Sequence, residues 1–140
     1  MLRQILLGGG VSIVNIVIHA VTMAILIHVG RKLLRDRHAW PVGRGMAVMV
    51  TTVAILMLVH VVEIIVWSIA YNLADVAPAG TDLLYFAFVN YTTLGYGDVV
   101  PLERWRLIGP ITALNGVVLI GWSTAVIFEV LRVIVRAHDQ

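Results

Sequence analysis

The chain carries one short run whose residue types and spacing could coordinate a bare cation. Gly95 and Gly97 flank Tyr96, and Thr93 stands two residues before the first glycine. Main-chain carbonyls can replace the water around a cation when successive carbonyls face the same side, which requires φ values that residues with side chains avoid. The two glycines permit such values, and the Thr93 hydroxyl adds one more oxygen. The run therefore predicts a row of oxygen ligands.

The residues before this run predict a short helix that enters a membrane and stops there. Thr81 and Asp82 are favourable helix-capping residues, and the largely apolar and aromatic stretch that follows is too short to span a bilayer. We expect this helix at residues 82–92 and the ion-binding run at 93–98. Non-helical backbone at membrane depth must be buried by protein or meet a water-filled cavity, and a re-entrant helix with an extended return fulfils that condition.

The composition places the chain in a membrane. Of its 140 residues, 60% are hydrophobic and 13% are charged, and the mean hydropathy is +0.95. Apolar runs at residues 5–29, 46–71 and 107–135 exceed the ~20 residues that a helix needs to cross about 30 Å of hydrocarbon. The first run is longer than the apolar core of a secretory signal, so we expect it to remain as a helix. The fold class predicted is an all-α membrane protein with three transmembrane helices plus the re-entrant one.

The expected organisation has three parts. They are an N-terminal transmembrane helix at 1–30, a basic loop at 31–45, and a unit at 46–136 that begins with a spanning helix at 46–72 and ends with another at 107–136. The basic residues of the loop are Arg31, Lys32, Arg35, Arg37 and Arg44. By the positive-inside rule this loop is cytoplasmic, so we expect the N-terminus outside the cell and the C-terminus inside, in the cell membrane.

The pattern Tyr-Phe-Ala-Phe-Val-Asn-Tyr-Thr-Thr-Leu-Gly-Tyr-Gly-Asp from Tyr85 to Asp98 resembles the pore loop of the potassium channel superfamily. Small bacterial channels with a two-transmembrane pore domain are the most similar type, and the resemblance covers about residues 46–135. It implies a homotetramer in which four filter segments surround one ion path and pass K+ selectively and passively. The residues that would hold K+ are Thr93, Leu94, Gly95 and Tyr96, with Gly97 completing the filter and Thr92 supporting it.

Several positions depart from the family pattern. Many members carry a pore-helix carboxylate that pairs with the filter aspartate, but the matching position here is Val89. Asp98 therefore needs another partner, for which Tyr85 and a neighbouring chain are the candidates. Leu94 replaces the more frequent valine, and we expect its side chain, like that of Tyr96, to turn away from the axis and pack against the short helix.

The last span carries candidate gating residues. Ile120, Thr124 and Phe128 share one helical face, which the resemblance turns toward the central cavity. A ring of phenylalanines can close a pore by dewetting, so a constriction at Phe128 is one hypothesis and a lipid-facing or packing role is the other. Gly116 and Gly121 are either hinges or close-packing sites.

Polar residues also occur inside the apolar spans, where an ionisable group is costly. His60 and Glu63 lie in the second span, and the first span carries Ser12, Asn15, His19 and Thr22 at helical spacing. We expect these two stripes to satisfy each other, with the first helix packed against the second outside the pore. A pH-sensing role for His60 and Glu63 is the alternative hypothesis, and a haem bound between His19 and His60 is a weaker rival. In the last span, Asn115, Trp122 and Ser123 are expected to form contacts between helices.

Other function classes find little support. No nucleophile–base arrangement or phosphate-binding loop is recognisable, so we expect neither an enzyme nor a cofactor beyond the permeant K+. Membrane lipid is an expected partner and nucleic acid is not, while a regulatory subunit is left open. The alternatives to a potassium channel are a non-selective cation channel and a non-conducting accessory subunit.

Overall fold

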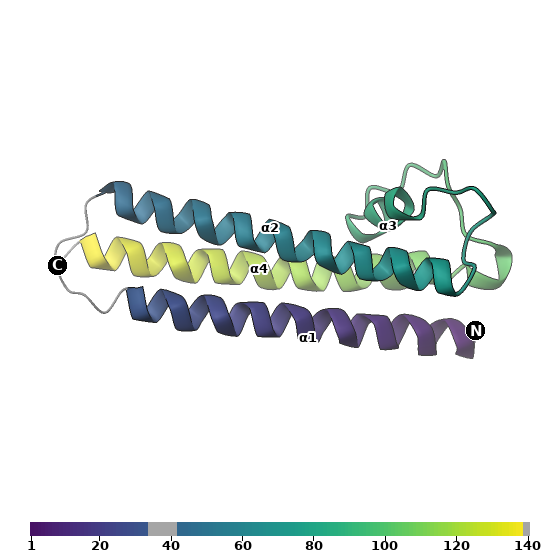
Figure 1. The fold of residues 1–140 in the computed structure, drawn as a ribbon, viewed down its shortest axis with the longest axis horizontal. Coiled ribbons are helices and arrows are strands. Elements are labelled where there is room, and N and C mark those ends of the chain that lie inside the picture. Colours follow the sequence, from purple (N-terminus) through teal and green to yellow (C-terminus); the bar gives the residue numbers. More distant parts are fainter. Residues whose placement is uncertain (34–41, 139–140) are drawn as a thin grey trace.

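The computed structural model describes residues 1–33 and 42–138, and this part of the chain is helical without strands. The elements are α1 (Leu2–Leu33), α2 (Val42–Leu73), α3 (Leu83–Tyr91), a 3-10 turn (Glu103–Trp105) and α4 (Ile108–His138). Three long helices run alongside one another, and α3 lies at the end of the bundle where the N-terminus is found (Figure 1). The loop predicted at 31–45 lies partly outside the described residues, as do the side chains of its basic residues other than Arg44.

The three long helices have the length and composition of membrane spans. They contain 32, 32 and 31 residues, which corresponds to about 47 Å each at about 1.5 Å per residue. The hydrocarbon core of a bilayer is about 30 Å thick, so each helix reaches beyond it at its ends. All three are long and apolar enough to cross a membrane. The predicted all-α membrane fold is thereby confirmed.

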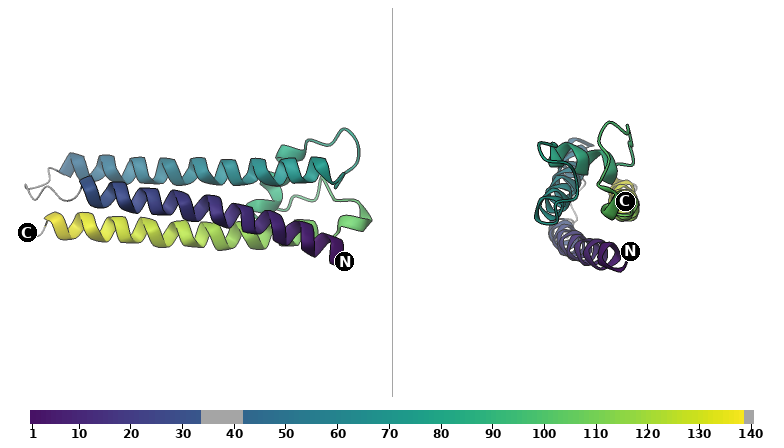
Figure 2. Two further views of the ribbon diagram at one scale, coloured as in Figure 1. Left: turned by 60° about the horizontal axis from the view of Figure 1, so that its bottom comes forward. Right: turned by 90° about the vertical axis from the view of Figure 1, so that its right-hand side faces the viewer.

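The helices form three layers. In the end-on view of Figure 2, α2 and α4 lie in the middle, α1 covers one side, and α3 with its following segment lies on the other side. The first helix packs against the second, as expected, and it also packs against α4, which the sequence did not indicate. A Cβ at Gly8 would lie 2.7 Å from Ile111 Cγ2, and the Gln4 side chain accepts a hydrogen bond from the Leu107 amide at 2.7 Å.

Aromatic packing fixes α3 against the middle helices. The rings of Trp67 and Tyr71 on α2 lie 5.9 Å apart, and Tyr71 lies 5.2 Å from Phe86 on α3. The Tyr71 hydroxyl is 2.7 Å from Thr112 Oγ1 on α4. Buried aromatic pairs of this kind contribute about 0.5–1.5 kcal/mol each beyond their buried area, so they hold the short helix at a defined depth.

The start of α3 follows the capping pattern in the sequence. The Asp82 side chain accepts hydrogen bonds from the amides of Leu84 and Tyr85 at 3.1 and 3.0 Å. This satisfies two of the amides that a helix start leaves without an internal partner. The helix ends at Tyr91, one residue before the predicted end, and Thr92 is its C-cap.

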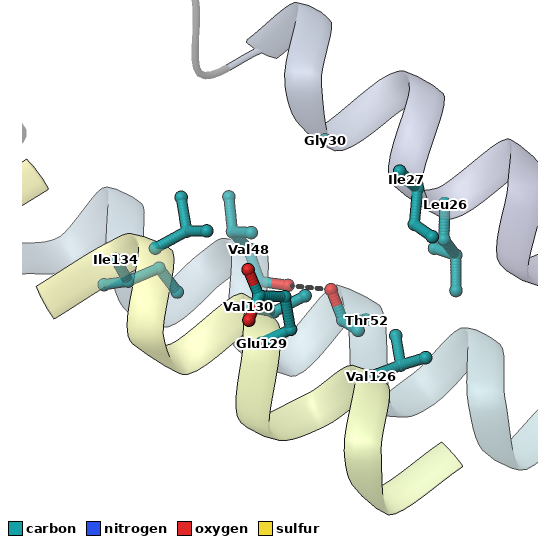
Figure 3. A pocket seen from close by; sticks show the side chains of 10 residues that line it. Leu26, Ile27, Gly30, Val48, Thr52, Val126, Glu129, Val130 and Ile134 are labelled. Atoms are coloured by element: carbon teal, nitrogen blue, oxygen red, sulfur yellow. Dashed lines mark hydrogen bonds between the residues drawn. The ribbon is translucent and has the colours of Figure 1, made fainter. Parts of the chain in front are cut away.

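An apolar pocket of roughly 200 Å³ lies between α1, α2 and α4 (Figure 3). Side chains that line it include Leu26, Ile27, Val48 and Val130. The Thr52 hydroxyl at its wall donates to the Val48 carbonyl of its own helix at 2.8 Å. The lining also includes Glu129, whose carboxylate pairs with Arg132 on the same helix at 3.4 Å. The rest of the wall is largely apolar.

Candidate functional site

The segment 92–98 leaves the C-terminus of α3, and all seven of its residues are exposed in the single chain. Its first half is tied back to the helix. The Thr92 hydroxyl donates to the Phe88 carbonyl at 2.7 Å, and the amides of Thr93 and Gly95 donate to the carbonyls of Asn90 and Val89 at 3.1 and 3.3 Å. The end of α3 thus fixes where the segment begins.

The backbone of this segment alternates in handedness. Thr93, Gly95 and Gly97 have φ of 61°, 60° and 78°, whereas Leu94 and Tyr96 between them have no positive φ. Alternation of this kind rotates successive peptide planes so that their carbonyls face one side. The glycines adopt the left-handed region at no steric cost, but Thr93 is strained there by about 1–2 kcal/mol. The sequence indicated the two glycines and gave no sign of the strain at Thr93.

The main-chain oxygens of residues 93–97 accept no hydrogen bond anywhere in the described part of the chain. These oxygens are therefore available to a ligand that needs electron-pair donors, such as a cation. The C-terminal end of α3 lies directly before them and adds the negative end of its helix dipole. Both features favour a cation over an anion.

Tyr85 and Asp98 connect α3 to the far end of the segment. The Tyr85 hydroxyl donates to Asp98 Oδ2 at 2.6 Å, and the Val99 amide donates to Oδ1 at 3.1 Å. This hydrogen bond to the carboxylate raises the pKa of Tyr85 above its ordinary value. Of the two candidate partners of Asp98, the structure brings Tyr85 to it. Val89 is buried and contributes its carbonyl to the segment rather than a side chain.

Two side chains of the segment differ from the expectation. Leu94 and Tyr96 are 54% and 69% exposed, so within one chain they do not pack against α3 as the sequence led us to expect. The reason is that α3 turns its buried face, which includes Phe86 and Tyr91, toward α2 and α4. Leu94 and Tyr96 project away from that core.

On α4, Ile120, Thr124 and Phe128 are all exposed in the single chain, and Phe128 is 67% exposed. Their role as cavity or gate residues stays a prediction. Gly116 has a clear packing role, because a Cβ there would lie 2.0 Å from the Tyr91 carbonyl oxygen. Gly121 is exposed, and a Cβ at this position would have nothing within 4 Å.

A second group of polar residues lies at the centre of the bundle around Glu63. His19 Nδ1 and His60 Nδ1 are each 2.9 Å from one oxygen of the Glu63 carboxylate, and the Tyr91 hydroxyl donates to Oε2. Glu63 and His19 are fully buried. We call these four residues the Glu63 cluster. It joins α1, α2 and the last residue of α3.

Further polar contacts surround the Glu63 cluster. The Asn15 amide donates to the Glu63 carbonyl at 3.1 Å and to Asn115 Oδ1 at 3.2 Å, and Trp67 Nε1 donates to the same Asn115 oxygen at 3.0 Å. The expected polar contacts between α1 and α2 are therefore present, and they extend to Asn115 on α4. Thr22 does not take part, because its hydroxyl donates to the Ile18 carbonyl of its own helix at 2.9 Å.

His19 and His60 do not face each other across a space that a haem would fill. Their ring centroids are 5.4 Å apart, and both rings contact the same carboxylate. Trp122 lies beside His19 with a centroid separation of 5.2 Å. Tyr91 was missed in the sequence because nothing local links the end of the short helix to a carboxylate in the second span. The pH-sensing hypothesis stays a prediction.

Much of the chain matches a known protein family. A protein-family model described as "Ion channel" matches residues 54–133, which is more than half of the chain. The matched range begins within α2, contains α3 and the segment 92–98, and ends within α4. It does not include α1. No curated protein matches the chain, and no solved structure does.

Proposed function

Since this chain belongs to the ion channel family, we propose that four copies of it form a potassium-selective pore that conducts K+ passively across a membrane. The observation that supports this most directly is the row of main-chain oxygens at residues 93–97. They lie on a backbone of alternating handedness and have no hydrogen-bond partner in the described residues. In this proposal K+ binds at Thr93, Leu94, Gly95 and Tyr96.

Selectivity for K+ follows from the way these oxygens would replace water. Four segments around an axis provide stacked rings of carbonyl oxygens, and a K+ ion that loses its hydration shell regains oxygen contacts there. The resemblance of the Gly-Tyr-Gly-Asp run to potassium channels supports K+ over Na+. The hydrogen bond between Tyr85 and Asp98 would hold the outer end of each segment at a constant distance from the axis.

A tetramer is proposed because one chain leaves a large apolar surface uncovered. Leu94 and Tyr96 are exposed, and so are Leu114, Val117 and Val118 on α4 at 67%, 54% and 52%. Part of this apolar surface would pack against neighbouring copies. Closed fourfold symmetry places the same segment of each copy at a common axis, as rings of oxygens require.

The proposed orientation places α3 and the segment 92–98 at the outer side of the cell membrane. The basic residues between the first two spans would then be cytoplasmic, as would the end of α4. The N-terminus lies at the same end of the bundle as α3, so it would be outside (Figure 1).

Flux from liposomes tests the proposal. The full chain is reconstituted alone, and K+-driven and Na+-driven fluxes are measured per incorporated protein. We expect a K+ flux with little Na+ flux. Gly95→Ala should lower the K+ flux about ten-fold or more, because a side chain at a φ of 60° introduces strain of about 1–3 kcal/mol beside the oxygens.

Gly80→Ala is the matched control for this test. Gly80 also has a positive φ, of 83°, with nothing within 4 Å of an added Cβ, but it lies in the loop before α3. The K+ flux through the Gly80→Ala variant should stay close to that of the wild type. Equal K+ and Na+ fluxes would identify a non-selective cation channel instead. A folded tetramer that passes neither ion would identify a non-conducting accessory subunit.

A further inference from the structure

Three side chains of the Glu63 cluster bring metal-ligating atoms together. One nitrogen each of His19 and His60 and a carboxylate oxygen of Glu63 lie within 4.8 Å of one another. They come from two helices that run in opposite directions, since His19 is on α1 and His60 and Glu63 are on α2. None of the three is required for the oxygen ligands proposed at residues 93–97.

The imidazole rings are oriented as in a metal site. Their Nδ1 atoms face Glu63, while His60 Nε2 and His19 Nε2 lie 2.9 and 3.5 Å from Ser123 Oγ on α4. A metal-binding histidine usually donates its second ring N–H to an acceptor, which fixes the ring and its tautomer. Ser123 is placed to accept that donation from either ring.

Without a metal, both rings can remain neutral and donate from Nδ1–H to the Glu63 carboxylate. With a metal, each ring can remain neutral with its proton on Nε2 instead, so that Nδ1 presents a lone pair. The Ser123 hydroxyl then accepts where it previously donated. Metal entry therefore needs a change of tautomer at His19 and His60 and no net charge on either ring.

We propose that His19, His60 and Glu63 form a binding site for a divalent transition metal of the Zn²⁺ class. Ligand atoms around a tetrahedral zinc ion stand roughly 3.4 Å apart. The two distances of 2.9 Å between Nδ1 and the carboxylate would therefore open slightly, and the widest separation, which is within 4.8 Å, would close toward that value. Tyr91, whose hydroxyl donates to Glu63 Oε2, then orients the carboxylate. The fourth position is left for water.

The donor set decides the class of metal. Two imidazoles and one carboxylate suit Zn²⁺ and similar ions, whereas Ca²⁺ and Mg²⁺ prefer oxygen ligands throughout. The charge also fits, because a divalent ion compensates the carboxylate that is buried at this depth in the bundle. His60 is 18% exposed and provides the side from which an ion enters.

Zn²⁺ binding to the purified full-length chain tests this site. Titration calorimetry in detergent should give one saturable Zn²⁺ site per chain. His60→Asn keeps an N–H donor for Glu63 but removes a ligand, and it should weaken Zn²⁺ binding about ten-fold to a hundred-fold. His28→Asn is the matched control, because His28 is an exposed histidine on the same helix as His19. The Zn²⁺ affinity of this variant should equal that of the wild type.

X-ray absorption of the wild-type zinc complex provides a measurement that needs no variant. We expect a first shell of nitrogen and oxygen at about 2.0–2.2 Å with the outer-shell scattering of two imidazoles. Absence of saturable binding, a shell without imidazole, or unchanged affinity in a folded His60→Asn protein would each overturn the site. None of these results bears on conduction through residues 93–97, so the two proposals fail separately.

Discussion

At the scale of single residues, the contact between Tyr85 and Asp98 links two parts of the chain that are 13 residues apart. The hydrogen bond to Asp98 stabilises the neutral phenol, and ionisation would in addition place a second negative charge against the carboxylate, so the pKa of Tyr85 is raised. The raised value means that the hydrogen bond is fully present below the ordinary tyrosine pKa of about 10 and is lost only as the pH rises through the higher value of the folded protein.

Asp98→Asn should lower the pKa of one tyrosine per chain, Tyr85, toward the ordinary tyrosine value. The neutral amide removes the negative charge that opposes ionisation of Tyr85. Tyrosinate absorbance of the detergent-solubilised protein between neutral and strongly alkaline pH measures this change. Glu103→Gln serves as control, because Glu103 is an exposed carboxylate that pairs with Arg106, and its titration curve should match that of the wild type. Identical curves for Asp98→Asn and wild type would contradict the assignment.

Local backbone conformation and helix capping were predictable from the sequence where they depend on the type of a single residue. The cap at Asp82 follows from residue type, and the glycines at 95 and 97 permit the positive φ found there. Tyr91 was not predictable in the same way, because its partner Glu63 is 28 residues away and no periodic pattern relates a re-entrant helix to a spanning one. Thr93 is another example, since its φ is imposed by the segment around it.

At the scale of elements, the position of α3 depends on a close approach to α4. The carbonyl oxygen of Tyr91 occupies the space that a side chain at residue 116 would need, and Asn90 Oδ1 lies 3.0 Å from a Cβ built at Gly109. Two glycines on one helix thus admit the last turn of the short helix. This close packing does not require Gly116 to act as a hinge.

Gly116→Ala should destabilise the protein by about 1–3 kcal/mol, because α3 and α4 must separate to admit the methyl group. Gly121→Ala is the matched control five residues along the same helix, where nothing lies within 4 Å of an added Cβ. That control should be neutral or stabilising by up to about 1 kcal/mol, as alanine favours the helix. Thermal unfolding in detergent, followed by helicity, compares the two variants. Equal transition temperatures would show that the contact is easily relaxed.

The three spanning helices were predictable from the sequence because the thickness of hydrocarbon sets a minimum length for an apolar run, and the helices extend beyond those runs. The arrangement of the helices was not, since hydropathy identifies a span without its rotation or its neighbours. Gln4 and Gly8 illustrate this limit. Their contacts with Leu107 and Ile111 place α1 against α4, although a glutamine or a glycine in an apolar run could face any partner.

At the scale of the whole molecule, the described helices alternate in direction. The N-terminus and α3 lie at one end of the bundle and the end of α4 lies at the other (Figure 1). Two exposed residues mark these ends. Ala79 lies in the loop between α2 and α3, and Arg136 lies in the last turns of α4. They make the proposed orientation testable.

Single cysteines report this orientation, because the chain has no cysteine of its own. Ala79→Cys should react with a membrane-impermeant maleimide in intact cells, since the positive-inside rule places that loop outside. Arg136→Cys should react only after the cells are permeabilised. The wild type should show no labelling. The opposite pattern would reverse the orientation while leaving the membrane fold intact.

The layer formed by α1 has a consequence for how this chain could be shortened or recombined. The family model spans residues 54–133, yet the carboxylate at position 63 within that span depends on His19 from outside it. Without α1, the Glu63 carboxylate would lose His19 and keep only His60 and the Tyr91 hydroxyl as partners, which leaves an ionisable group incompletely satisfied at membrane depth. Transfer of residues 54–133 into another protein therefore needs the first helix as well, or neutralisation of Glu63 in the same step.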